Sequence, residues 1–140
     1  MTNVQQLHIQ IAQHLQTLKR ELDRLAVRQA SLDRCRRRIL AEKADDSTDE
    51  EDESFDAVIE NVDAIEYDLS TFKEQMRERL VHAERGLRFM SIYSDEKNAG
   101  MFYQYILDGT LLCIRDAAVA REGYDELIVN VQEMSHLRDL

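Results

Sequence analysis

The chain has 140 residues, which is enough for one domain that buries its own core without disulfides or metal ions. It contains no proline and only four glycines, so the composition favours helix nearly everywhere and gives β-strands almost no support. Its two cysteines, Cys35 and Cys113, have no partner at zinc-binding or CxxC spacing, and we interpret both as reduced, buried side chains. The composition therefore predicts a single all-α domain.

The net charge of −10 comes from one segment. Residues 42–68 hold 13 acidic residues and one lysine, a net charge of −12, so the rest of the chain sums to +2. Four arginines crowd together just before this segment: Arg34, Arg36, Arg37 and Arg38. The densest part of the acidic run contains Asp49, Glu50, Glu51, Asp52 and Glu53. A basic cluster thus leads directly into an acidic run.

The first predicted helix spans about residues 2–41. Its apolar residues recur at heptad spacing, which is typical of a helix that packs along one seam against other helices. These residues are Val4, Ile11, Leu15, Leu18, Leu22, Leu25, Leu32 and Ile39. Gln29 and Arg36 interrupt the seam in the second half of the helix. That half is expected either to protrude or to meet a different neighbour.

Residues 42–54 are predicted to form an acidic flexible linker. They contain eight carboxylates and no large apolar side chain, so they have little to bury and they repel one another.

The second predicted helix spans about residues 55–93, and its apolar stripe steps by threes and fours. The stripe consists of Phe55, Val58, Val62, Ile65, Leu69, Phe72, Met76, Ala83, Leu87 and Met90. The third predicted helix spans about residues 95–138, with a possible break near Gly123 because glycine weakens helices. Between residues 101 and 120 it is apolar around most of its circumference, so we expect it to be contacted on more than one side.

One short turn and one flexible linker between three long helices predict an up-down-up bundle with coiled-coil-like heptad seams. Five aromatic residues would then gather at one end, where the start of the first helix meets the turn. They are Phe89, Tyr93, Phe102, Tyr103 and Tyr105. This aromatic end either forms a pocket for a partner or closes the core where the three helices meet.

The surplus apolar surface of the third helix is the main candidate for an interface. Its residues are Phe102, Tyr105, Leu111, Leu112, Ile114 and Val119. We therefore expect a non-catalytic helical interaction module: a subunit, adaptor or chaperone-like component of a larger assembly. Its partner would be another protein or a second copy of the chain.

A second hypothesis comes from the charged segments. The arginine cluster and the acidic run could make charge-mediated contacts, in which case the protein would be an acidic inhibitor or nucleic-acid mimic that binds a positively charged site. Direct binding of nucleic acid by the arginines is disfavoured, because the neighbouring acidic run competes for them. Replacing the acidic residues within 45–53 distinguishes the two hypotheses, since only the mimic depends on them.

Catalysis and metal binding have little support in the sequence. A di-iron carboxylate bundle needs two Glu-x-x-His pairs, whereas Glu133 and His136 form the only such pair and Glu78 and His82 are four residues apart. Cys113 has no histidine in a motif that would activate it. We expect no enzyme activity and no cofactor or metal.

The first ten residues, MTNVQQLHIQ, resemble neither a signal peptide nor a membrane span, so we expect an intracellular, cytoplasmic protein without membrane insertion.

Overall fold

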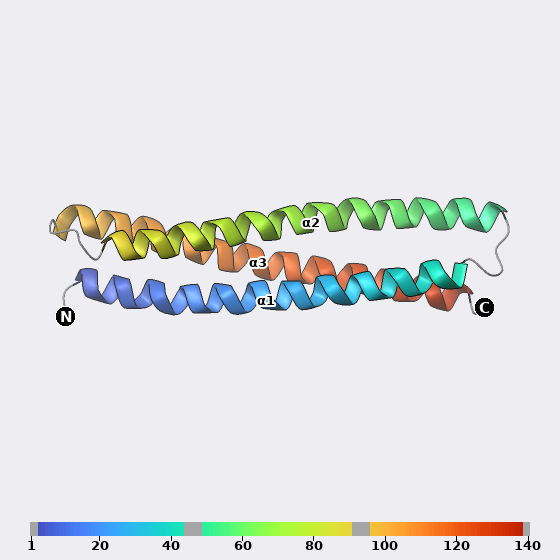
Figure 1. The fold of residues 1–140 in the computed structure, drawn as a ribbon, viewed down its shortest axis with the longest axis horizontal. Coiled ribbons are helices and arrows are strands. Elements are labelled where there is room, and N and C mark those ends of the chain that lie inside the picture. The colour runs from blue at the N-terminus through green and yellow to red at the C-terminus, as the bar shows by residue number, and fades with distance from the viewer. Residues whose placement is uncertain (1–2, 44–48, 91–95, 139–140) are drawn as a thin grey trace.

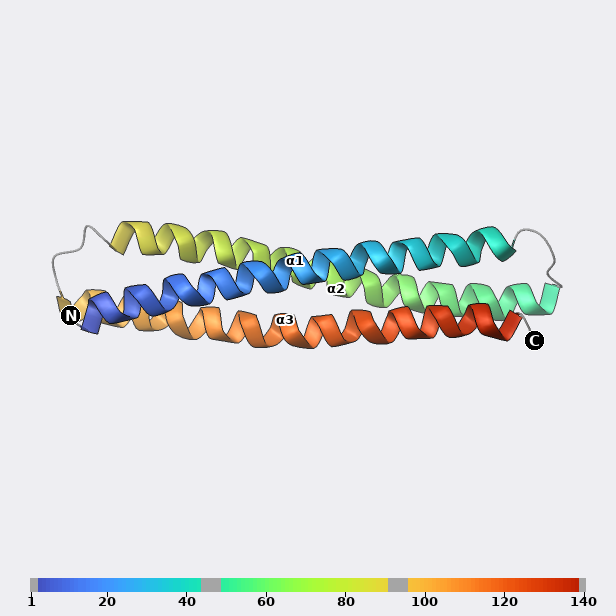
Figure 2. The same cartoon turned by 90° about the horizontal axis from the view of Figure 1, so that it is seen from below.

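The computed structural model describes residues 3–43, 49–90 and 96–138, and these residues form three α-helices (Figure 1). They are α1 (Asn3–Lys43), α2 (Asp49–Met90) and α3 (Glu96–Arg138). Helix α2 runs antiparallel to α1 and α3, and the two ends of the chain lie at opposite ends of an elongated bundle (Figures 1 and 2). The predicted all-α, up-down-up bundle of three long helices is confirmed.

The predicted acidic linker is too long at both ends. Residues 42 and 43 belong to α1, and residues 49–54 already belong to α2. Acidic residues at the start of a helix are stabilised by the positive end of the helix dipole, and glutamate is itself a good helix former. The repulsion that suggested a linker is therefore compatible with the first turns of a helix. Residues 44–48 lie outside the described residues.

Helix α3 continues through Gly123 without the predicted break. A Cβ atom at this position would lie 3.3 Å from Cδ2 of Leu69 on α2. The absence of a side chain therefore leaves room for Leu69 to pack against the backbone of α3, and glycine has a packing role here rather than a helix-ending one.

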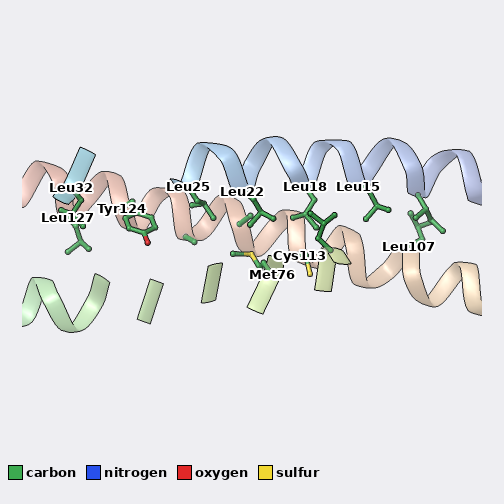
Figure 3. Packing of buried hydrophobic residues seen from close by; sticks show 14 of the residues in the cluster. Leu15, Leu18, Leu22, Leu25, Leu32, Met76, Leu107, Cys113, Tyr124 and Leu127 are labelled. Atoms are coloured by element: carbon green, nitrogen blue, oxygen red, sulfur yellow. The ribbon is translucent and has the colours of Figure 1, made fainter. Parts of the chain in front are cut away.

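The predicted apolar seam of α1 is the buried side of that helix. Seven of its members are buried: Ile11, Leu15, Leu18, Leu22, Leu25, Leu32 and Ile39. Figure 3 shows the leucines of α1 directed toward side chains of α3 and α2. Burial at intervals of three and four residues makes one continuous core along the length of the bundle.

In α2 the buried positions differ from the predicted stripe. Val58 and Ile65 are exposed, whereas Ile59 and Leu80 are buried. Lys73 is also buried, at a position that an apolar pattern does not identify. The buried side of α2 therefore includes the charged residue Lys73, while some apolar residues of the helix lie in solvent.

The most extensive interface joins α1 and α3, although these two helices are parallel and not consecutive in the chain. The buried side of α3 includes small side chains, which allow neighbouring helices to approach closely: Thr110, Cys113, Ala117 and Ala120. At the edge of this interface Arg121 Nη1 donates to Glu21 Oε2 at 2.9 Å, and Arg28 Nε donates to Asp125 Oδ1 at 2.8 Å. These two ion pairs connect α3 to α1.

The second half of α1 does not protrude. Gln29 remains inside the bundle, where its side-chain oxygen accepts a hydrogen bond from Lys73 Nζ and its Nε2 lies 3.4 Å from the hydroxyl of Ser70. Gln29, which interrupts the apolar seam of α1, is thus half-buried and meets polar residues of α2, among them the buried Lys73.

Tyr124 is the largest fully buried side chain in the described part of the core. Its hydroxyl points toward α2 in Figure 3, and it has no hydrogen-bond partner among the described residues. Burial raises the pKa of Tyr124 to about 12, and the negative charge of Glu66 acts in the same direction. Tyr124 therefore stays protonated in the folded state at pH values where an exposed tyrosine ionises.

This difference predicts a loss of stability at high pH. Between about pH 10 and 12, Tyr124 ionises in the unfolded chain but stays largely protonated in the folded one. The free energy of unfolding therefore falls as the pH rises through this range. The loss from this group is about 1 kcal/mol at pH 11. Tyr124→Phe should remove this component, which urea unfolding at pH 8 and pH 11 would measure. Tyr67→Phe, at an exposed position, is the control, and equal pH dependence in both variants would contradict the prediction.

Candidate interaction surface

One side of α3 is exposed along much of its length. Six positions separated alternately by four and three residues, and therefore on one side of the helix, are all exposed. We call them the outer stripe: Met101, Tyr105, Asp108, Leu112, Arg115 and Val119. Figure 2 shows that this helix has α1 and α2 on one side and no other helix of the described chain on the opposite side. Four of the six side chains are apolar or aromatic, so the stripe is an apolar surface interrupted by one acidic and one basic residue.

The predicted interface residues on α3 mostly lie at this surface. Tyr105 and Val119 are 79% and 62% exposed, and Leu112 is 42% exposed. Leu111, also partly exposed, borders the stripe. Ile114 instead is partly buried and packs against the hydrophobic core. Phe102 is exposed next to the stripe.

The sequence interpretation missed Met101, which is 68% exposed. Its distance of four residues from Tyr105 was the available signal, because residues at that spacing share a helix face.

The aromatic end of the bundle is not one cluster. Tyr103 alone among the described members is buried, and its hydroxyl lies 3.0 Å from His8 Nδ1 of α1. The two rings meet edge to face, with centroids 5.6 Å apart, and burial raises the pKa of Tyr103. Phe89, like two of the α3 aromatics, is exposed. Of the aromatic residues that were expected to close the core at this end, Tyr103 is therefore the one that the described structure buries. Tyr93 lies outside the described residues.

The arginine cluster divides into one bridging residue and three exposed ones. Arg36 donates to Asp63 at 2.7 Å and to Glu66 at 2.8 Å on α2, and to Asp33 on its own helix at 2.7 Å. Arg37 is largely exposed and contacts only the other oxygen of Asp33 in the described structure, at 2.8 Å. Arg36 thus connects α1 to α2.

The remaining predicted charge-contact residues divide into two groups. Arg34 and Arg38 are exposed. The side chains of the acidic candidates lie outside the described residues: Asp49, Glu50, Glu51, Asp52 and Glu53. The structure therefore brings Arg36 together with acids of the second helix that were not among the predicted contacts.

Burial opposes the negative charge of Glu66 in this cluster. Removal from solvent raises the pKa of Glu66, although the positive charge of Arg36 acts to lower it, and Asp33 and Asp63 raise it further. The three carboxylates around Arg36 therefore depend on that guanidinium for their charge balance. This arrangement suits a structural connection between helices, because the arginine is already surrounded by acceptors.

A shallow groove of about 410 Å³ lies between α1 and α2 near the N-terminal end of α1. Lys19 and Glu84 form an ion pair of 3.0 Å across it. Its other lining residues are His8, Ala12, Leu15, Gln16, Leu87 and Arg88. The groove contains no nucleophile with an activating base, so it offers no recognisable catalytic arrangement.

Within residues 3–43, 49–90 and 96–138, no group of three or more histidine, cysteine, aspartate or glutamate side chains is arranged to hold a metal ion. None of the three described helices has an apolar stretch sufficient to cross a lipid bilayer. Comparison with protein family models, with curated proteins and with solved structures gives no match for this chain.

Proposed function

We propose that the protein is a non-catalytic helical interaction module that joins a larger protein assembly through the outer stripe of α3, by contacts of the coiled-coil type. The observation that carries this proposal is the exposure of Tyr105, Leu112 and Val119 at heptad spacing on a helix whose opposite side is fully packed. Apolar side chains at this spacing form a straight ridge that fits between the side chains of another helix.

The composition of the stripe supports an interface rather than an incompletely packed core. Tyrosine and methionine are enriched in protein interfaces, and an exposed tyrosine offers a large contact area at little cost in conformational entropy. The stripe runs through 19 residues of continuous helix, which corresponds to about 27 Å along the axis. A ridge of that length matches several turns of a partner helix.

The test is to place a charge in the stripe. Leu112→Glu is expected to dissociate the assembly, because a carboxylate in a closed apolar interface loses its hydration without gaining a partner. Sedimentation velocity at micromolar concentration and pull-down at physiological salt would measure the loss. Val27→Glu on α1 is the control, because Val27 is an exposed apolar residue (65%, against 42% for Leu112) that lies outside the stripe. Equal behaviour of the two variants would contradict the proposal, provided that circular dichroism shows unchanged helicity in both.

The acidic-mimic hypothesis predicts a different pattern in the same measurements. Neutralising the acidic residues within 45–53 should abolish binding to a positively charged partner and leave contacts through the outer stripe intact. A module that works through α3 should retain its partner in this variant and lose it in Leu112→Glu. The pair of variants therefore separates the two functions.

A further inference from the structure

The outer stripe has an internal symmetry in its sequence. Tyr105 and Val119 each lie seven residues from Leu112. Asp108 lies three residues before Leu111, and Arg115 lies three residues after Leu112. The first pair is centred on Leu112 and the second halfway between Leu111 and Leu112, so the two centres differ by half a residue, or about 0.8 Å along the helix axis. Reversing the stripe about this level therefore brings an apolar residue close to an apolar residue, and an acid close to a base.

We propose that the partner on this surface is a second copy of the same chain, bound antiparallel through α3 with a two-fold axis at the level of Leu111 and Leu112. This inference rests on the proposed function of the outer stripe and names its occupant. In the pair, Tyr105 of each copy lies opposite Val119 of the other, and the leucines meet at the centre. Such an interface is self-complementary, as a two-fold axis requires.

Charge selects the antiparallel orientation. In a parallel pair in register, Asp108 would face its own copy and Arg115 would face its own copy, so like charges would be opposed twice. In the antiparallel pair each Asp108 faces an Arg115, which gives two attractive pairs symmetrically placed about the centre. Both residues are exposed, so both are available for such contacts.

The contacts that Asp108 and Arg115 make within their own chain leave both side chains able to pair with a second copy. Asp108 accepts a hydrogen bond from Gln104 one turn earlier at 2.9 Å, which leaves acceptor capacity on its second oxygen. Arg115 lies 3.6 Å from Asp116 on the same helix, a long and solvent-exposed ion pair. Gly109, between the two charged positions, has no atom within 4 Å of an added Cβ, so a second helix can approach the backbone there.

The test is a charge exchange across the two-fold axis. Asp108→Arg alone and Arg115→Asp alone should each oppose like charges and weaken the dimer at least tenfold. A mixture of the two single variants should restore association, because each chain then supplies the charge that the other needs. The double variant Asp108→Arg with Arg115→Asp should dimerise by itself. Sedimentation equilibrium between 1 and 100 µM would follow all four samples, with Glu78→Arg on α2 as a control that leaves dimerisation unchanged.

Three outcomes would overturn the inference of an antiparallel dimer. They differ in whether the proposed function of the outer stripe fails as well. A wild-type protein that is monomeric throughout this range, yet loses another protein partner in Leu112→Glu, has a functional stripe that a different chain occupies. A dimer that dissociates in Leu112→Glu but is unaffected by either charge reversal uses the stripe with another alignment. A dimer that survives both Leu112→Glu and the charge reversals does not use the stripe, which contradicts the proposed function as well.

Discussion

Replacing Leu22 with alanine is expected to lower the free energy of unfolding by about 2 to 4 kcal/mol. Leu22 is 4% exposed and belongs to the continuous core between α1 and the other two helices (Figure 3). Removing three carbon atoms there takes away apolar burial and leaves a cavity, because the long, packed helices cannot collapse locally to fill it. The melting temperature should fall by roughly 8 to 16 °C.

Urea or thermal unfolding at one fixed protein concentration would measure this loss, since any self-association makes the melting temperature concentration-dependent. Val27→Ala on the same helix is the matched control, because Val27 is 65% exposed. Its effect should stay within about 0.5 kcal/mol. If Leu22→Ala and Val27→Ala have the same melting temperature, the buried side of α1 is not the one described.

Replacing Arg36 with methionine is expected to cost about 2 to 3 kcal/mol at neutral pH. The variant keeps most of the aliphatic length but removes the guanidinium that binds Asp33, Asp63 and Glu66. Three carboxylates would then lie close together without a cation, and the most buried of them, Glu66, would have lost its opposite charge. The connection between α1 and α2 should weaken, since these contacts join the two helices.

The cost of Arg36→Met should depend on pH. Glu66 gains from the charge of Arg36 only while it is ionised, and burial raises its pKa. The difference from the wild type should therefore be largest near pH 7 and should shrink as the pH falls through the raised pKa of Glu66. Arg37→Met is the control, because Arg37 is 77% exposed on its side chain and an exposed pair contributes about 0 to 1 kcal/mol. A difference that persists unchanged at pH 3 would show that Arg36 contributes through packing rather than charge.

The helices themselves could be predicted from local information. Absence of proline, abundant helix-forming residues and apolar repeats at three and four residues act within each segment, so they predict helices without reference to neighbours. In α1 the same repeat also predicted the buried side, because Leu15, Leu18, Leu22 and Leu25 leave no competing apolar stripe. The ends of the helices were less predictable, since acidic residues suit both a solvated linker and a helix N-terminus.

The buried side of α2 could not be predicted in the same way. Val58 and Ile65 were as apolar as their buried neighbours, whereas Lys73 is buried and donates a hydrogen bond to Gln29 of α1. Glu66 likewise depends on Arg36. Whether a charged residue can be buried is a property of the pair, and the pair forms only when two helices lie at a particular alignment.

The sequence by itself therefore determined that this protein is a set of long helices with an apolar seam in α1 and surplus apolar surface in α3. Only the tertiary structure decided which part of that surplus remains exposed. The small residues Ala117 and Ala120 lie on the buried side of α3, which packs against α1 and α2, and this packing leaves Tyr105, Leu112 and Val119 exposed. Helical periodicity is set by the backbone of each segment, whereas the side that faces solvent is set by how closely other helices can approach.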